Sequence, residues 1–278
     1  MIEFKDVSFT YDSGNKNAGI YNINLNINAG EVVVFCCESG CGKTTISRLI
    51  NGLIPGYYSG NLTGSVIVNE HEISKNSINE LSQYVGSVFQ NPRTQFFNVD
   101  STSEIAFACE NFGISREEIC KRIGKVTKEL NIKNLLDKSL FSISGGEKQK
   151  IACASAAAME PKIYVLDEPS SNLDIQTIKM LKDIIKKWKE KKSTVVIAEH
   201  RLQYLIDIAD RFIYMKDGEI NKEFSCVEFK ELSNSTLNDM GLRSIHTIDT
   251  NSRMKNIESK EQIEIKDFMF SYGKKPFL

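Results

Sequence analysis

The sequence predicts an α/β fold whose core is a mainly parallel β-sheet covered by helices. Short, continuously apolar runs, which are typical of buried parallel strands, occur at 32–36, 163–166 and 194–198. Segments with helical patterns separate these runs, and residues 174–190 show one apolar face at helical spacing. Strands that alternate with helices along the chain favour a parallel core sheet.

Two further regions are predicted around this core. Residues 3–11 and 20–27 alternate apolar and polar side chains, and residues 65–73 resemble a strand and turn of a hairpin. We therefore expect an antiparallel β subdomain. Residues from about 95 to 145 are helical in pattern and rich in charge, and they lie between two segments of the predicted core. They are expected to form an inserted α-helical subdomain.

The composition limits the functional class. The 278 residues are 41% hydrophobic, which allows a sizeable core, and the net charge of −1 gives no basic field of the kind that attracts nucleic acid. No apolar stretch approaches the roughly 18 residues of a membrane-spanning helix, and the first residues do not resemble a signal peptide. Seven cysteines at irregular spacing argue against a disulfide framework and favour a reducing cytosol.

The most specific motif lies between the strand predicted at 32–36 and a predicted helix. Its sequence, CESGCGKTT, has the context of a P-loop, in which backbone N–H groups and a helix N-terminus converge on phosphate oxygens. Gly40 and Gly42 allow the backbone to approach the phosphates closely. Lys43 would supply a positive charge at the β- and γ-phosphates, and the hydroxyl group of Thr44 would bind Mg²⁺. The residues expected to bind nucleotide are Cys37, Glu38, Ser39, Gly40, Cys41, Gly42, Lys43, Thr44 and Thr45.

Cysteines give this loop two unusual features. The usual motif begins with glycine, whereas this chain has Cys37. If the backbone there needs a positive φ, cysteine would be strained. If the position needs only a small side chain, cysteine fits. Cys36, Cys37 and Cys41 are also close enough in sequence to raise the question of a metal site. Metal binding is the less favoured interpretation, because no Cys or His motif of zinc spacing accompanies them.

Two acidic residues follow the apolar strand predicted at 163–166. Asp167 and Glu168 stand at its carboxyl end, which is the edge of an open α/β sheet where ligands bind. Asp167 is expected to hold Mg²⁺ through water, and Glu168 is expected to polarise the attacking water as a general base. An acidic pair before a proline turn says little by itself. Together with the P-loop it makes ATP with Mg²⁺ the expected ligand.

These motifs make the chain resemble the ABC ATPases. Residues 143–147, ISGGE, are similar to the LSGGQ signature of that family and stand shortly before the acidic strand, as they do there. The resemblance implies a P-loop NTPase with a RecA-like core. It also implies that Ser144, Gly145 and Gly146 face the γ-phosphate of a nucleotide. Glu147 departs from the family glutamine, because it lacks the amide donor and adds negative charge.

Further single residues match this family in the expected order. Gln90 matches the Q-loop, which implies a contact with Mg²⁺ and water and a link to the membrane subunit. His200 matches the switch histidine near the γ-phosphate, and residues 171–174 match the D-loop. Tyr11 matches the aromatic residue that stacks on adenine. Taken singly, each residue could equally be an ordinary loop, capping or strand residue. It is their joint occurrence in the family order that supports the assignment. Glu168, His200 and Gln90 are then the expected catalytic group.

A narrower resemblance is to the energy-coupling factor (ECF) ATPases, which drive the uptake of vitamins or of cobalt and nickel. It rests on the sequences around 90–97, 104–111 and 199–202. Some of those proteins are tandem fusions. In this chain IEIKDFMFSY at 263–272 repeats IEFKDVSFTY at 2–11, which indicates the start of a second copy of the domain.

The repeat predicts the domain organisation. An ABC ATPase domain is expected over 1–226, a linker over 227–261, and the start of a second, truncated ABC domain over 262–278. The family resemblance implies that two nucleotide domains sandwich two ATP molecules, so a single domain cannot complete a site. The second domain would be the missing C-terminal half, a further copy of this chain or a paralogue.

The other expected partners are integral membrane transport subunits, which would place the chain on the cytoplasmic face of the cell membrane. No nucleic acid is expected as a partner. The main alternative is a soluble ABC ATPase that remodels ribosomes or DNA, which the near-neutral charge disfavours. A third interpretation is a catalytically degenerate, regulatory half, for which Cys37 and Glu147 are the only support.

Overall fold

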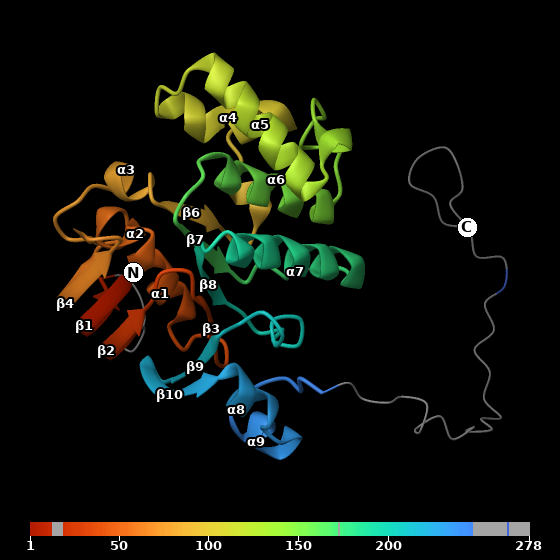
Figure 1. Ribbon diagram of the computed structural model, residues 1–278. Coiled ribbons are helices and arrows are strands. Elements are labelled where there is room, and N and C mark those ends of the chain that lie inside the picture. Colours follow the sequence, from red (N-terminus) through yellow and green to blue (C-terminus); the bar gives the residue numbers. More distant parts are fainter. Residues whose placement is uncertain (13–18, 172, 247–265, 267–278) are drawn as a thin grey trace. The chain divides into compact units, whose positions relative to one another are not determined.

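The computed structural model describes residues 1–12, 19–171, 173–246 and 266. Residues 1–245 form one compact unit, whose helices and strands are labelled in Figure 1. The repeat at 263–272 lies outside the described residues except at Lys266, and the second domain predicted there remains a prediction.

The core of the unit is a six-stranded sheet with the strand order β10-β9-β3-β8-β7-β6. The strands from β9 to β6 run parallel to their neighbours, whereas β10 pairs antiparallel at one edge. The strands are β3 (Val32–Cys36), β6 (Val85–Val88), β7 (Ile163–Asp167), β8 (Thr194–Ala198), β9 (Arg211–Lys216) and β10 (Glu219–Ser225). The parallel core predicted from three apolar runs is therefore confirmed.

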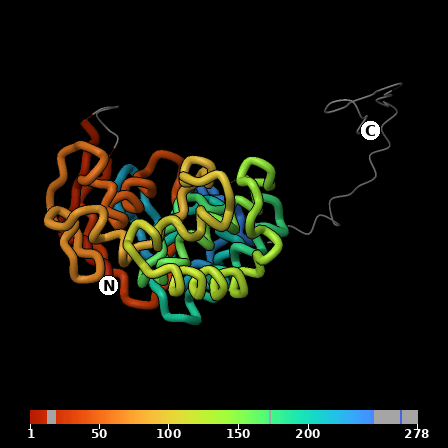
Figure 2. Tube along the Cα trace, turned by 90° about the horizontal axis from the view of Figure 1, so that it is seen from above, coloured from red at the N-terminus to blue at the C-terminus, as the bar shows by residue number. Residues whose placement is uncertain are grey.

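A second sheet has four antiparallel strands in the order β2-β1-β4-β5. They are β1 (Ile2–Tyr11), β2 (Gly19–Ile27), β4 (Gly60–Val68) and β5 (His71–Glu72). Side chains on one face of this sheet are buried, as the alternating pattern predicted, and Phe4 of β1 lies opposite Leu25 of β2. Figure 2 shows these strands, in red and orange, gathered at one side of the compact unit.

Helices connect the strands and cover the sheets. They are α1 (Lys43–Ile50), α2 (Leu53–Gly56), α3 (Ile78–Leu81), α4 (Ser101–Asn111), α5 (Arg116–Leu130), α6 (Gly145–Ala158), α7 (Ile175–Glu190), α8 (Cys226–Lys230) and α9 (Asn234–Asp239). α4 and α5 fall within the segment predicted as a helical insert and pack on α6, away from α8 and α9 in Figure 1. Among the described residues, none of the helices combines the length and the apolar character needed to cross a bilayer.

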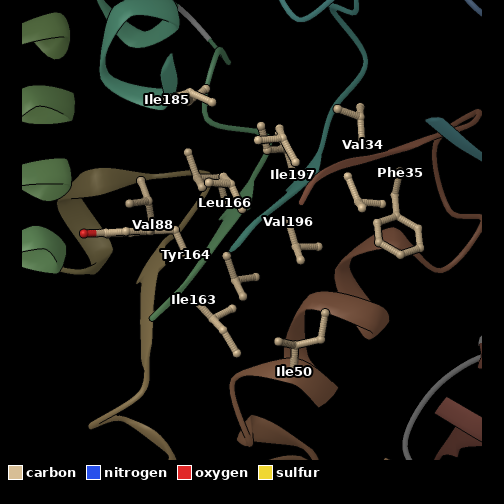
Figure 3. Packing of buried hydrophobic residues seen from close by; sticks show 14 of the residues in the cluster. Val34, Phe35, Ile50, Val88, Ile163, Tyr164, Leu166, Ile185, Val196 and Ile197 are labelled. Carbon is tan, nitrogen blue, oxygen red and sulfur yellow. The ribbon is translucent and has the colours of Figure 1, made fainter. Parts of the chain in front are cut away.

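The core sheet is packed between helices. Figure 3 shows Ile50 of α1 and Ile185 of α7 on opposite sides of the strands that carry Leu166 and Val196. All four side chains are fully buried. Each such burial stabilises the fold by about 1.5–3 kcal/mol relative to an exposed side chain, so the strand ends that carry the polar residues are held on a rigid base.

The C-terminal part of the compact unit differs from the predicted linker. Phe229 of α8 is fully buried and stacks on Phe212 of β9 with 4.1 Å between the ring centroids. Leu237 of α9 is also fully buried. Part of the segment predicted as a linker is therefore folded into the compact unit, with α8 packed on β9 and β10, because a few apolar side chains are buried in a stretch whose composition is mostly polar.

Candidate functional site

The P-loop connects β3 to α1 and has the backbone that phosphate binding requires. Gly40 and Gly42 have φ values of +88° and +104°, in the left-handed region that favours glycine. A Cβ atom on Gly42 would lie 2.6 Å from Cγ2 of Ile20, so this position also lacks room for a side chain. α1 begins at Lys43, directly after Gly42. The free N–H groups of its first turn and its dipole therefore favour an anion at the loop.

Cys37 occupies the first position of the loop without the strain that was open from the sequence. Its backbone is not among those with a positive φ. The side chain is 1% exposed, so a small residue fits there. The sulfur atoms of Cys37 and Cys41 lie in bonding contact as a disulfide, with their Cα atoms 6.4 Å apart. The cysteine spacing argued only against a disulfide framework and did not predict this single pair, which forms because the loop turns back and brings the two residues together.

Lys43 points back into the loop. Its Nζ atom donates to the carbonyl oxygens of Cys37 at 3.3 Å and Glu38 at 3.2 Å, and lies 3.0 Å from Sγ of Cys37. Burial lowers the pKa of the Lys43 ammonium, while the nearby charge of Glu168 raises it. The ammonium is thus held beside the loop amides, where it can neutralise phosphate charge.

Two oxygen donors meet between the P-loop and the end of β7. The Thr44 hydroxyl donates to Oδ1 of Asp167 at 3.2 Å. Burial raises the pKa of Asp167, and the hydrogen bond from Thr44 opposes that shift. A hydroxyl group and a carboxylate are the hard oxygen ligands that Mg²⁺ takes in proteins, so these residues fit the predicted metal ion.

Glu168 is the centre of a polar cluster built from three loops. Nε2 of His200 lies 3.0 Å from Oε1 of Glu168, and Nε2 of Gln90 donates to Oε2 at 2.7 Å. The hydroxyl group of Ser171 donates to the same Oε2 at 3.3 Å. The structure therefore brings together all three residues predicted as catalytic, with both carboxylate oxygens engaged.

Glu199 joins two of these loops, although no sequence motif assigned it to the site. Its carboxylate accepts from the backbone N–H groups of Ser170 at 3.2 Å, His200 at 2.7 Å and Arg201 at 3.1 Å. The phenol of Tyr204 donates to it at 2.9 Å. Glu199 is 2% exposed, and a buried carboxylate with four donors fixes the loops that supply them. The signal available from the sequence was an acidic residue directly after a buried strand.

Tyr11 lies beside the P-loop. Its hydroxyl group is 3.1 Å from Oγ1 of Thr45 and accepts a hydrogen bond from Arg48 at 3.0 Å. Arg48, which no sequence motif indicated, also stacks on the ring of Tyr58, with its Cζ atom 4.0 Å from the ring centroid. A cavity of about 310 Å³ lies among these residues, and it is lined by Tyr11, Gly19, Ser39, Gly40, Gly42, Lys43, Thr44, Thr45, Arg48 and Glu168.

The predicted signature segment lies elsewhere. Ser144 is the N-cap of α6 and forms a capping box with Glu147, whose carboxylate accepts from the Ser144 backbone N–H at 2.8 Å. These bonds lower the pKa of Glu147. Ser144 and Gly145 are exposed, and Gly146 is half-buried. Among the described residues these three are not part of the lining of the 310 Å³ cavity, so they do not meet the P-loop of their own chain.

A glycine-rich loop that opens a helix at the carboxyl ends of parallel strands is the arrangement with which P-loop ATPases hold nucleotides, and the chain is a protein of this class. The family model described as ABC transporter matches residues 20–171. The chain therefore belongs to the ABC transporter family of ATP-binding domains.

Related proteins carry names that agree with this family. A Treponema denticola protein with the name "Putative ABC transporter ATP-binding protein" is 47% identical over 257 residues, which cover 92% of this chain and 52% of that protein. A similarly named protein of Pyrococcus horikoshii is 40% identical over 236 residues, covering 82% of this chain and 83% of its own length. The chain thus spans about half the length of the Treponema denticola relative.

Solved structures of similar proteins have the same fold. The structure of cbiO1 from Clostridium perfringens, described as part of the ABC transporter complex cbiONQ, matches with a TM-score of 0.73 at 27% identity, covering 83% of this chain and 90% of that one. A dimeric structure of the ATP-binding cassette MJ0796, bound to ADP and Pi, matches with a TM-score of 0.69 at 28% identity, covering 81% of this chain and 99% of that one.

Proposed function

We propose that the chain binds ATP with Mg²⁺ at the P-loop and hydrolyses it to drive an importer of the ECF type. The observation that carries the proposal is the cluster of Glu168, His200 and Gln90 next to Lys43, Thr44 and Asp167. Phosphoryl transfer to water needs positioned positive charge, a metal ion and a group that orients the water. Lys43 supplies the charge, Thr44 and Asp167 would hold the metal ion, and Glu168 would orient the water.

The residues divide the work by their positions. Lys43 and the amides at the start of α1 would hold the phosphates, while Thr44 and Asp167 would hold Mg²⁺, whose charge would neutralise that of the phosphate oxygens. Glu168 takes the proton of the attacking water as a general base. The imidazole of His200 and the amide of Gln90 hold that carboxylate in place through its two oxygens. Tyr11 would support the adenine ring.

A second ABC domain would complete the site. Ser144, Gly145 and Gly146 do not line the 310 Å³ cavity of their own chain, and they stand at the positive end of a 14-residue helix, so they suit a nucleotide held by another domain. The dimeric structures of MJ0796 support this arrangement. The partner is the C-terminal half of a longer protein, a second copy or a paralogue. The half-length match to a relative and the repeat at 263–272 favour the first of these.

Integral membrane subunits would receive the movement of the two ABC domains as they close on ATP. The chain would then lie on the cytoplasmic face of the membrane. The membership of cbiO1 in a transporter complex supports this assignment, and vitamins or transition-metal ions are the proposed cargo. A ribosomal or DNA-directed role has no comparable support at a net charge of −1. A degenerate half is disfavoured, because Cys37 is unstrained and Glu147 serves as part of a helix cap.

The test is the ATPase rate of the chain as a function of protein concentration. The proposal expects the rate per molecule to rise with concentration, because two domains must meet. A full rate that does not depend on concentration would refute the need for a second domain. Pull-down from membranes of the source cell distinguishes a transporter subunit from a ribosome-directed ATPase. Integral membrane subunits are expected in the bound fraction, and ribosomes are not.

A further inference from the structure

The phosphate loop contains a pair of cysteines that the ATPase chemistry does not use. Cys37 and Cys41 are four residues apart, and their Cα separation of 6.4 Å lies within the range that a disulfide spans. All seven cysteines belong to the described part of the chain. The others are unpaired, namely Cys36, Cys109, Cys120, Cys153 and Cys226. Pairing is therefore specific to the loop.

The two sulfur atoms differ in access. Cys37 is 1% exposed, whereas Cys41 is half-buried and lines a cavity of about 770 Å³ together with Glu38, Ser39 and Gly40. This cavity lies on a flank of the loop, and Cys41 is not among the residues lining the 310 Å³ nucleotide cavity. A small oxidant can therefore reach Cys41, and a bond between the two sulfurs does not fill the nucleotide cavity.

Lys43 links the cysteine pair to the phosphates. Its Nζ atom is 3.0 Å from Sγ of Cys37. In the reduced loop the same arrangement would bring the Lys43 ammonium next to a Cys37 thiolate. A thiolate would hold Lys43 in an ion pair and add negative charge where the phosphates bind, whereas a disulfide sulfur carries no such charge.

We propose that Cys37 and Cys41 form a reversible thiol–disulfide site that reacts with low-molecular-weight disulfides and thereby sets the affinity of the loop for nucleotide. The thiolate of Cys41 attacks the small disulfide, forms a mixed disulfide and releases one small thiolate. The thiolate of Cys37 then attacks the sulfur of Cys41 and releases the second. Two protein thiols are oxidised, and one small disulfide is reduced to two thiols.

The oxidised loop should bind Mg·ATP more tightly than the reduced loop. The cross-link fixes five residues in the conformation that the phosphates require, so less chain entropy is lost on binding. It also removes the competing charge from Lys43. Together we expect a dissociation constant about three- to tenfold lower in the oxidised form. This inference rests on the proposed nucleotide site.

The experiment treats the 278-residue chain with oxidised glutathione or with dithiothreitol. Peptide mapping by mass spectrometry locates any disulfide, and calorimetry measures the dissociation constant of Mg·ATP in each state. The expected result is a Cys37–Cys41 bond with tighter binding, reversed by dithiothreitol. Cys41→Ser should abolish the difference between the two treatments. Cys120→Ser, which removes an exposed unpaired thiol on α5, should retain it.

Two results would overturn the proposal. One is the absence of a Cys37–Cys41 bond after treatment with oxidised glutathione. The other is an equal dissociation constant in the two states. If the bond forms but neither state binds Mg·ATP, the nucleotide site itself is refuted, and the affinity effect is refuted with it. That outcome is distinct from equal, measurable binding in both states, which leaves the ATPase proposal intact.

Discussion

The Nε2 atom of His200 lies 3.0 Å from Oε1 of Glu168, although the two residues are 32 positions apart in the chain. They meet because β7 and β8 are parallel neighbours with Asp167 opposite Ala198. The backbone N–H of Glu168 donates to the Ala198 carbonyl at 2.8 Å, which extends the ladder into the site. The position of the proposed base relative to its imidazole partner is thus set by the register of the core sheet.

Replacing Glu168 with glutamine should separate binding from hydrolysis. The amide keeps the size of the side chain but cannot accept the proton of the attacking water, so turnover should fall by about 10²–10⁴-fold. Nucleotide binding should persist, since Lys43 and the loop amides are unchanged. Single-turnover hydrolysis and Mg·ATP titration measure the two properties. Turnover close to that of the unmodified chain would remove Glu168 from the mechanism.

Glu199→Gln should slow turnover without weakening ATP binding. The amide can no longer accept from all four donors, and leaving a buried donor unpaired costs about 1–3 kcal/mol of unfolding free energy. The loop that carries His200 should then shift, and a misplacement of this kind lowers kcat by roughly 10–100-fold.

The comparison for Glu199→Gln is Tyr204→Phe, which removes only one of its four donors. We expect a smaller loss of kcat there, with the KM for ATP within about twofold of the starting value in both variants. If both variants lose stability equally while kcat stays constant, Glu199 is a structural residue and does not position the histidine.

The parts of the site that the sequence predicted are those encoded in short segments. CESGCGKTT fixes the loop, the helix start and the lysine within nine residues, and Asp167 with Glu168 ends an apolar strand. The Glu199 network and the contact between Arg48 and Tyr11 could not be predicted in this way. They join residues that only the tertiary fold brings together, such as Ser170 and Tyr204 around one carboxylate.

The fold shows the same division. Continuously apolar runs predicted β3, β7 and β8, whereas β6 contains Gly86 and Ser87 and gives a weak strand signal. The packing of α8 and α9 was missed because the surrounding residues are polar and only a few side chains, including Phe229 and Leu237, are buried.

Asp167→Asn should stabilise the chain at neutral pH. Burial raises the pKa of Asp167 in the folded state, so its contribution to stability is present below the unfolded value of 3.8 and is lost as the pH rises through the folded value. Asparagine carries no charge at any of these pH values. We expect a Tm higher by roughly 2–4 °C at pH 7 and a difference that disappears below about pH 3.8.

The matched control for Asp167→Asn is Asp183→Asn, on the surface helix α7. Thermal unfolding in the absence of metal and nucleotide measures the effect for both. A lower Tm for Asp167→Asn at pH 7 would mean that the carboxylate is stabilised by Thr44 and Lys43 more than it is destabilised by burial, contrary to the direction of its pKa shift.

Mixing two inactive variants should restore hydrolysis if the signature of one chain completes the site of another. Ser144→Ala removes the hydroxyl group at the start of α6, and Glu168→Gln removes the base; each alone should be nearly inactive as a homodimer. In a mixed dimer one site pairs the intact Glu168 of the first variant with the intact Ser144 of the second.

That mixed dimer should recover a substantial part of the rate of one wild-type site, because one of its two sites is intact. The other site carries both substitutions and should be inactive. Loss of the Ser144 cap also costs about 0.5–2 kcal/mol, so the mixture is compared at a temperature where circular dichroism shows Ser144→Ala to be folded. Lys43→Ala mixed with Glu168→Gln is the control, since both changes affect the P-loop side of the sites and no intact site can form. Equal rates from the two mixtures would show that Ser144 does not act across a dimer interface.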